Sequence, residues 1–317
     1  METSPTTSIA TWYRRFARQA AGDSPTYQRL AEAVADDPDL LHLLADLPEE
    51  KRQPNLLFAA VRYLEGPVDD AADFRWWVCR HWSEVAATMR QRRTQTNEAG
   101  RCATLLPVLA TLPEPLALLE VGASAGLCLI PDAYRYRYGE HVVGDPDSPV
   151  ELECAVSGNV PLPSRIPEVV WRAGLDLNPL DVREPDTMRW LEALVWPEQE
   201  HRRARLQAAA RLVAATPPRL VRGDLLTDLP ALAAQAPSDA TLVVFHTAVI
   251  TYVPVAHRRA AAELLRRVAS HWISNEARDV FPDISQGLDV PPDSFVLALD
   301  GRPVGYAAQH GKALHWL

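Results

Sequence analysis

The chain has 317 residues, of which 47% are hydrophobic and 23% are charged, and its formal net charge at pH 7 is −9. This composition is typical of a soluble globular protein and excludes a largely disordered chain. The negative charge argues against an extended nucleic-acid groove, because phosphate contacts require a basic face. A chain of this length suits two domains of unequal size or one elaborated α/β domain.

The cysteines and the N-terminus point to the cytoplasm. The cysteines are widely spaced, form no CxxC pair and show no metal-ligand spacing, so we interpret them as buried thiols in a reducing compartment. The N-terminus lacks the apolar core of a signal peptide, and no later stretch is long and apolar enough to span a bilayer. We therefore expect a cytoplasmic protein with no metal, no membrane partner and no nucleic-acid partner.

The first hundred residues show helical periodicity and no strong strand signal. The predicted helices cover residues 9–21, a segment that begins at Ser24-Pro25, and residues 40–47, 56–64 and 74–92. We expect an α-helical cap or substrate domain over residues 1–100.

The pattern changes at residue 116 to strands that alternate with helices. The predicted strands are residues 116–121, 169–175, 219–222, 241–245 and 271–274, and the predicted helices are 127–133, 187–215 with a break at Pro197, 229–236 and 255–269. This alternation predicts a parallel sheet with helices on both faces. Asp300-Gly301 between residues 294–299 and 304–309 predicts a closing antiparallel hairpin. The predicted α/β domain is 101–317, with an inserted strand or hairpin at about 144–165.

The predicted first strand ends in Glu120-x-Gly122-x-Ser124-x-Gly126. Such a turn can let a nucleotide approach the backbone, with Glu120 bonding an amine or sugar hydroxyls. It can instead be the nucleophile elbow of a serine hydrolase, with Ser124 as the nucleophile. A third interpretation is a tight turn that needs only small residues. The hydrolase alternative also requires earlier strands and an oxyanion loop, and the upstream sequence is helical.

The next two predicted strands also end in carboxylates. Asp176 follows the second strand, where an acidic residue can bind ribose hydroxyls, and Asp224 with Leu225 follows the third, where adenine could be held. The alternative for Asp224 is a helix N-cap. Three acidic strand ends favour a nucleotide-type site more strongly than one Gly-rich turn does.

These motifs resemble the first three motifs of class I S-adenosylmethionine-dependent methyltransferases. The matching residues are Glu120-x-Gly122-x-Ser124-x-Gly126, Gly174-Leu175-Asp176-Leu177-Asn178-Pro179 and Gly223-Asp224. The resemblance implies a Rossmann-like methyltransferase-type sheet and S-adenosylmethionine as cofactor. It places Glu120 near the methionine amino group or a bound water, Gly122, Ser124 and Gly126 along the cofactor, Asp176 at the ribose, and Asp224 with Leu225 at the adenine. About 50 residues separate the turn from Asp176, roughly double the usual βαβ spacing.

Nearly the whole chain also resembles the bacterial family DUF2332, which implies no established reaction. The matching stretches are KRQPNLLF at 51–58, RTQTNE at 93–98, the Gly-rich turn, GDPDSP at 144–149 and VWPEQ at 195–199.

Two residues at later strand ends are candidate catalytic groups. His246 follows the fourth predicted strand, where it could deprotonate an acceptor hydroxyl or amine. The alternative is a histidine that bonds a backbone carbonyl. Glu276, just beyond the fifth strand, is the second candidate.

Polar residues before the α/β domain are candidate substrate or cofactor contacts. They are Asn97, Glu98 and Arg101, and Arg52 lies in a similar polar stretch. The alternative for them is an interdomain polar network.

The sequence therefore predicts a methyltransferase that acts on O or N of a small molecule held between cap and sheet. Two alternatives remain: a serine hydrolase that uses Ser124, and a nucleotide-binding protein without turnover. The sequence does not specify the substrate or the oligomeric state.

Overall fold

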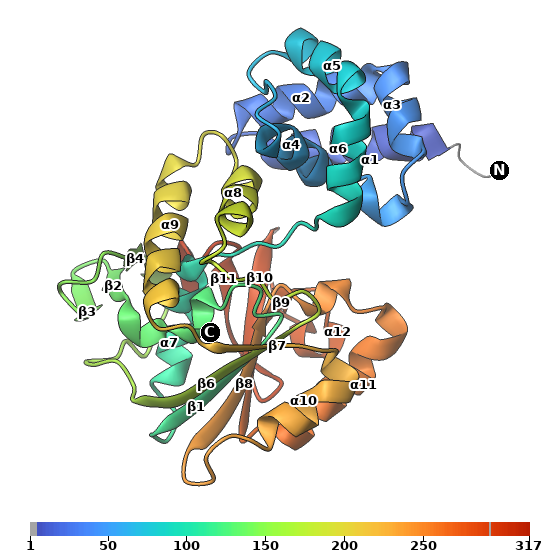
Figure 1. Cartoon of the computed structure of the whole chain (residues 1–317). Coiled ribbons are helices and arrows are strands. Elements are labelled where there is room, and N and C mark those ends of the chain that lie inside the picture. Colours follow the sequence, from blue (N-terminus) through green and yellow to red (C-terminus); the bar gives the residue numbers. More distant parts are fainter. Residues whose placement is uncertain (1–4, 292) are drawn as a thin grey trace. The chain divides into compact units, whose positions relative to one another are not determined.

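The computed structural model describes residues 5–291 and 293–317 and divides into two compact units (Figure 1). The helical unit contains residues 5–96 and 183–204, and the α/β unit contains residues 97–182 and 205–317. Residues 183–204, which the sequence analysis placed in the α/β domain, thus pack within the helical unit.

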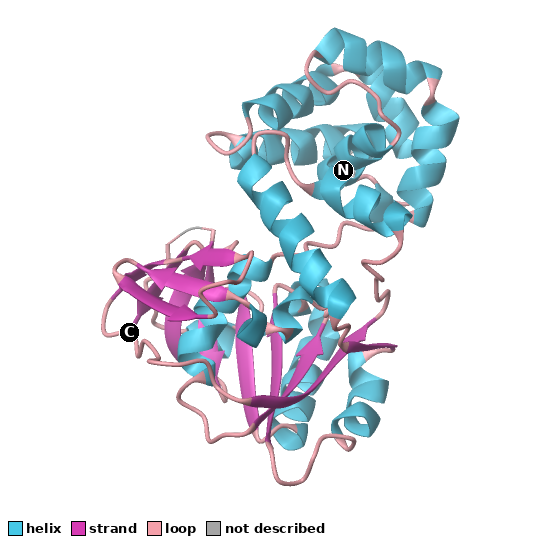
Figure 2. Ribbon diagram, turned by 60° about the vertical axis from the view of Figure 1, so that its left-hand side comes forward, coloured by secondary structure: helices cyan, strands magenta, loops and turns pink. Residues whose placement is uncertain are grey.

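Helices and loops make up the helical unit (Figure 2). Its elements are α1 (Pro5–Ala20), α2 (Pro25–Asp36), α3 (Pro38–Ala45), the 3-10 helix η1 (Glu49–Lys51), α4 (Pro54–Tyr63), α5 (Ala71–Arg80), α6 (Trp82–Gln91) and α8 (Pro185–Leu194). Side-chain caps begin α2, α3 and α5, where Ser24, Asp37 and Asp70 accept backbone N–H groups that have no helical partner. The single helix predicted over 74–92 is interrupted at His81.

The aromatic core of the helical unit explains why residues 183–204 belong to it. Phe58 is fully buried and contacts Tyr27 at a ring-centroid distance of 4.8 Å. Trp190 of α8 is 2% exposed and belongs to the same core. Its indole N–H donates to the Arg93 carbonyl at 3.0 Å, and the Glu198 carboxylate accepts the Thr26 N–H at 2.8 Å. This segment therefore contributes apolar surface and polar contacts to the helices from the N-terminal part of the chain.

The α/β unit is built on a sheet of nine strands within the described residues. The strands are β1 (Leu116–Val121), β5 (Ala155–Ser157), β6 (Val169–Asp176), β7 (Arg219–Arg222), β8 (Thr241–Thr247), β9 (His271–Ala277), β10 (Ser294–Leu299), β11 (Arg302–Ala308) and β12 (Ala313–Trp316), in the order β5-β12-β11-β10-β9-β8-β1-β6-β7. The strands β7, β6, β1, β8 and β9 are mutually parallel. The fold is thus a mixed α/β fold with a large, mostly parallel sheet.

The predicted closing hairpin is confirmed. β10 and β11 pair antiparallel around Asp300 and Gly301, which both have positive φ, at 53° and 77°. An Asp-Gly pair tolerates this backbone well, and the resulting turn suits the twist of a hairpin. β10 is the strand that lies next to β9, and β12 extends the sheet beyond the hairpin.

Further helices precede β1 or lie between consecutive strands of the large sheet. They are α7 (Cys102–Leu109), α9 (Glu200–Ala215, which begins in the helical unit), α10 (Leu225–Ala233), α11 (Val255–Val268) and α12 (Pro282–Ser285). In Figure 1, α10 and α11 run side by side on one face of the sheet. Their apolar side chains form one core with alternate residues of the central strands, such as Leu119 and Val244.

The connection between β1 and β6 contains most of the inserted structure. A separate small sheet has the order β3 (His141–Gly144), β2 (Arg135–Tyr138), β4 (Glu151–Glu153). The alternating segment 150–156 forms both β4 and β5, which join different sheets on either side of Cys154. The extra length before Asp176 is therefore an insertion that leaves the parallel strands intact.

The helix predicted over residues 127–133 is wrong. Two short 3-10 helices, η3 (Leu127–Leu129) and η4 (Pro131–Ala133), occupy this segment. Pro131 has no N–H to bond back to the Leu127 carbonyl, so an α-helix cannot continue through it. Tyrosine hydroxyls bond the carbonyls that an α-helix would otherwise have paired: Tyr134 donates to the Leu127 carbonyl at 2.7 Å and Tyr136 donates to the Pro131 carbonyl at 2.6 Å.

A membrane-spanning helix would need a long apolar stretch. No helix in the described part of the chain is long and apolar enough to cross a bilayer.

Candidate functional site

The predicted acidic residues lie at one edge of the sheet. Glu120 is near the end of β1 and pairs in register with Gly174 of β6 and Phe245 of β8. Asp176 ends β6, and Asp224 follows β7. Because these strands are parallel, their carboxyl ends meet at the same edge. The strands β6 and β7 lie on one side of β1, and the strands β8 and β9 lie on its other side. The direction in which the chain adds strands to the sheet therefore reverses between β1 and β8.

The Gly-rich turn has three left-handed residues. The φ angles are 71° at Gly122, 50° at Ser124 and 75° at Gly126. A Cβ added to Gly122 would lie 2.4 Å from the Cγ2 of Val249, which follows β8. Glycine is therefore required there both by backbone conformation and by close packing. Because the 3-10 helix η3 follows this turn, the turn does not present the α-helix N-terminus that the sequence analysis expected.

Asp176 supports the Gly-rich turn directly. Its Oδ2 accepts the Ser124 N–H at 2.8 Å, and its Oδ1 accepts the Asn178 N–H at 2.6 Å. These bonds orient the carboxylate and hold the turn against the end of β6. A carboxylate has about four lone-pair positions, so each oxygen of this half-buried group can accept a further bond.

Two predicted contact residues also hold the turn and the segment before α7. Asn97 donates from Nδ2 to the Ser124 Oγ at 2.9 Å and accepts the Ala125 N–H at 2.9 Å. Glu98 is 4% exposed and pairs with Arg205 at 2.8 Å. The structure thus brings Asn97 to the Gly-rich turn, whereas the Glu98 carboxylate is held in an ion pair.

Glu120 and Arg101 are buried close to each other. Glu120 is 5% exposed and Arg101 is 8% exposed. Burial raises the pKa of the Glu120 carboxyl well above its usual range, the nearby Cys128 raises it further, and the Arg101 guanidinium acts in the opposite direction. Arg101 donates from Nη1 to the carbonyl and hydroxyl oxygens of Thr247 at 2.9 and 3.1 Å. Among the described residues, Glu120 Oε2 and Arg101 Nε are buried without a hydrogen-bond partner.

The two predicted catalytic residues contact each other inside the core. His246 is 0% exposed, and its Nδ1 lies 2.6 Å from Glu276 Oε1. Its Nε2 accepts the Trp272 indole N–H at 2.9 Å, so the ring is the Nδ1–H tautomer that donates to Glu276. With both nitrogens bonded, His246 presents no free lone pair to a substrate in this conformation.

Glu276 fixes the loop that follows β8. The same Oε1 accepts the N–H groups of Val249 and Ile250 at 2.8 and 3.0 Å. The preceding residue, Ala248, has a φ of 54°, a conformation that an alanine adopts only when its surroundings hold it. The Glu276 carboxylate thus positions the loop whose Val249 side chain packs on Gly122.

The remaining predicted residues have local structural partners. Asp224 is exposed and caps α10, with Oδ1 accepting the Leu226 N–H at 2.7 Å, and Leu225 is 8% exposed within the core. Arg52 belongs to the helical unit, where it donates to the Leu47 and Ala45 carbonyls at 2.8 and 2.9 Å. The N-cap interpretation of Asp224 therefore holds, and Arg52 closes the end of α3.

Asn275 is a residue of this edge that the sequence analysis missed. It pairs in register with Thr247, is 1% exposed, and has a buried Oδ1 without a partner among the described residues. Its signal in the sequence was a polar triplet, Ser274-Asn275-Glu276, that continues a buried strand. The described residues contain no cluster of three or more His, Cys, Asp or Glu side chains that could hold a metal ion.

Comparison with known proteins identifies the family of this chain. Neither the curated proteins nor the solved structures include a significant match to this chain. A family model described as "Uncharacterized protein conserved in bacteria (DUF2332)" matches residues 10–316. The match covers both units and the whole of the carboxyl edge described above, and the chain therefore belongs to the DUF2332 family.

Proposed function

We propose that the α/β unit binds S-adenosylmethionine and that the protein is a methyltransferase acting on O or N of a small molecule. The observation that carries this proposal is the row of acidic residues, Glu120, Asp176 and Asp224, at the carboxyl ends of three neighbouring parallel strands. In open α/β sheets, ligands bind outside the carboxyl ends of the strands, where the strand order reverses. The order β7-β6-β1-β8-β9 is the doubly wound order 3-2-1-4-5, with the reversal between β1 and β8.

The residues present fit the groups of this cofactor. The half-buried Asp176 carboxylate retains lone pairs for two ribose hydroxyls while it holds the turn. The unpartnered Glu120 Oε2 can accept a hydrogen bond from the methionine ammonium. The exposed Asp224 carboxylate has one bonded oxygen, and its other oxygen can accept the adenine amino group.

The protein's own contribution to methyl transfer would be to bind and orient the reactants. When bound, S-adenosylmethionine would supply an electrophilic methyl group for the acceptor atom, with the C–S electron pair left on sulfur and the acceptor's proton released to water. Orientation of this kind can supply much of the rate enhancement. We assign His246 and Glu276 a positioning function, because Glu276 holds the loop after β8 and His246 bonds Glu276 and Trp272. The use of His246 as a base would require its Nε2 to leave Trp272.

Ser124 supports a second candidate function, that of a serine hydrolase. A serine with a φ of 50° in a Gly-x-Ser-x-Gly turn after a strand matches the form of a nucleophile elbow. His246, however, is bonded to Glu276 and Trp272, so it does not activate Ser124 in this conformation. Covalent labelling by a fluorophosphonate probe that is lost in Ser124→Ala would favour the hydrolase. The remaining alternative is a protein that binds the nucleotide without turnover, and it would yield no methylated product.

Isothermal titration of the full-length protein with S-adenosylmethionine and S-adenosylhomocysteine tests the proposal. We expect micromolar binding that is lost in Asp176→Ala. Asp239→Ala is the matched control, because Asp239 is exposed in the loop that leads into β8, at the opposite edge of the sheet. No heat with either ligand, or equal binding by Asp176→Ala and the wild type, would contradict the proposal.

A further inference from the structure

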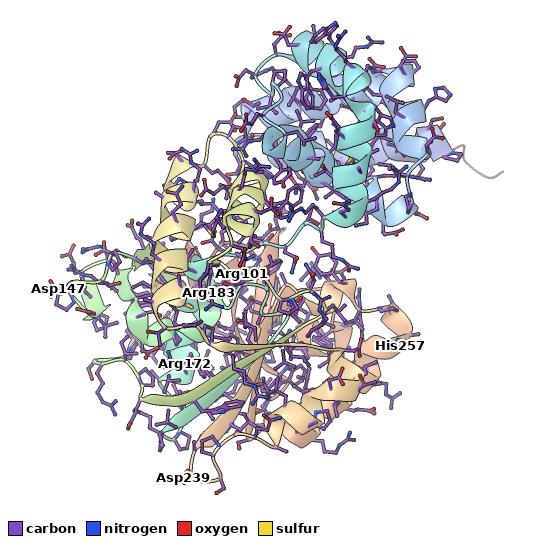
Figure 3. All side chains as sticks on the ribbon, in the orientation of Figure 1. Arg101, Asp147, Arg172, Arg183, Asp239 and His257 are labelled. Carbon is purple, nitrogen blue, oxygen red and sulfur yellow. The ribbon has the colours of Figure 1, made fainter. Side chains whose placement is uncertain are left out.

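Three polar side chains from separate segments are buried on one face of the sheet near its carboxyl edge. Glu120 pairs with Phe245, and Thr247 pairs with Asn275, so strand alternation places Glu120, Thr247 and Asn275 on the same face. Arg101 precedes α7 and bonds Thr247 on that face. Figure 3 shows Arg101 at the opposite end of the sheet from Asp239, which lies in the loop before β8.

Glu120, Arg101 and Asn275 each have a polar atom that the described residues leave unsatisfied, whereas the Thr247 hydroxyl accepts from Arg101. Glu120, Arg101 and Asn275 are 5%, 8% and 1% exposed. Glu120 Oε2, Arg101 Nε and Asn275 Oδ1 are buried without a hydrogen-bond partner in the part of the chain that the structure describes. Buried polar groups in proteins are almost always hydrogen-bonded, because an unsatisfied one loses its bonds to water and gains none in return. Three such atoms together indicate a ligand.

The chemistry of the three atoms defines that ligand. Glu120 Oε2 and Asn275 Oδ1 are acceptors, whereas Arg101 Nε is a donor on a permanent cation. A simple cation would leave Arg101 unsatisfied and be repelled by it, and a simple anion would bring no donor to Asn275 Oδ1 and Glu120 Oε2. A dipolar group with an ammonium beside a carboxylate satisfies all three atoms without adding net charge.

We propose that Glu120, Asn275 and Arg101 form a subsite for an α-amino acid zwitterion. The ammonium donates to Glu120 and Asn275, and the carboxylate accepts from Arg101. This inference deepens the proposed function. The identification of the zwitterion as the methionine end of S-adenosylmethionine rests on that function. Arg101 and Asn275 become residues that distinguish the complete cofactor from a nucleoside that lacks the amino acid.

Titration calorimetry with three ligands tests the subsite. S-adenosylhomocysteine contains the nucleoside and the amino acid, 5′-methylthioadenosine contains the nucleoside alone, and L-methionine contains the amino acid alone. We expect Arg101→Met and Asn275→Leu to weaken S-adenosylhomocysteine about 10- to 100-fold. Neither substitution should change the affinity for 5′-methylthioadenosine. Arg172→Met is the matched control, since Arg172 pairs with Asp132 on the preceding connection and not with this cluster.

The outcomes separate the two proposals. Equal affinity of the wild type for S-adenosylhomocysteine and 5′-methylthioadenosine would overturn the subsite and leave the nucleoside site intact. Millimolar binding of L-methionine that depends on Arg101, with no binding of either nucleoside, would support the subsite and contradict the cofactor. No binding of any of the three ligands would overturn both. Arg101→Lys, which keeps the charge, guards against misfolding: it should retain the fold and recover part of the affinity.

Discussion

Glu120 and Arg101 carry groups of opposite charge on the same buried face of the sheet, but no hydrogen bond or ion pair joins them in the described structure. Burial outweighs the nearby guanidinium, so the pKa of the Glu120 carboxyl lies well above its usual range. Cys128 and Asp176 act in the same direction as burial. The ligand-free protein therefore favours a neutral Glu120.

The pH dependence of stability follows from this raised pKa. Above the unfolded-state pKa, near 4.5, the folded protein retains a proton that the unfolded chain has lost, so this contribution to stability falls as pH rises. Glu120→Gln replaces the carboxyl with a neutral amide, so this fall in stability with rising pH should disappear. We expect the Gln variant to gain stability relative to the wild type as pH rises above about 5, by up to about 1.4 kcal/mol per pH unit until the pH reaches the folded-state pKa of Glu120.

Denaturant unfolding at several pH values measures this difference. Glu114→Gln is the control: Arg165 and the Glu168 N–H lower the pKa of Glu114, so its stabilising contribution is lost only at acidic pH and the Gln variant should differ from the wild type by a constant amount from pH 5 to pH 8. If the free energies of unfolding of Glu120→Gln and the wild type differ by a constant amount from pH 5 to pH 8, Glu120 is solvated or paired.

Asp176 and Asp224 should respond differently to the same substitution. Asp176→Asn leaves one acceptor oxygen for two N–H groups, so we expect a loss of about 1–2 kcal/mol in the free energy of unfolding. Asp224→Asn should change stability by less than about 0.5 kcal/mol, since asparagine caps helices as well as aspartate does. Thermal or denaturant unfolding of both variants makes the comparison. Equal effects would mean that the Asp176 carboxylate does not hold the Gly-rich turn.

The strands and their acidic ends could be predicted from the sequence because the signals are local. The apolar run of β1 and the carboxylates Asp176 and Asp224 are contiguous with the strands they end, and Asp300-Gly301 determines its own turn. The packing of Trp190 with the N-terminal helices is a contact between distant segments, and no local pattern reveals it.

The functions of the site side chains were harder to predict for the same reason. The register of β8 with β9 brings Glu276 to His246. The same register places Asn275 in its buried position. The helix predicted over 127–133 failed because a proline and the hydroxyls of Tyr134 and Tyr136 favour 3-10 turns there. The sequence thus identified the correct edge of the sheet, whereas the partner of each side chain required the tertiary structure.

Gly122 and Val249 should be energetically coupled. A Cβ at Gly122 would lie 2.4 Å from the Val249 Cγ2, and the φ of 71° adds backbone strain. We expect Gly122→Ala to lower the free energy of unfolding by more than about 2 kcal/mol. In a Val249→Ala background the two closest contacts disappear and the residue 249 Cβ remains at 3.1 Å, so the cost should fall to little more than the backbone strain, about 1–2 kcal/mol. A double-mutant cycle by denaturant unfolding measures the coupling, and additive effects would place Val249 away from the turn in solution.

His246 should be a fixed Nδ1–H tautomer, because the Trp272 indole can only donate to Nε2 and the Glu276 carboxylate accepts from Nδ1. The ¹⁵N shifts of the His246 ring should show a protonated Nδ1 and an unprotonated Nε2. Trp272→Phe removes the indole donor and leaves Nε2 buried without it, at an expected cost of about 1–3 kcal/mol. A wild-type ring protonated at Nε2 would refute the Trp272 bond and restore His246 as a candidate base, because that nitrogen would then be available to exchange a proton with a substrate.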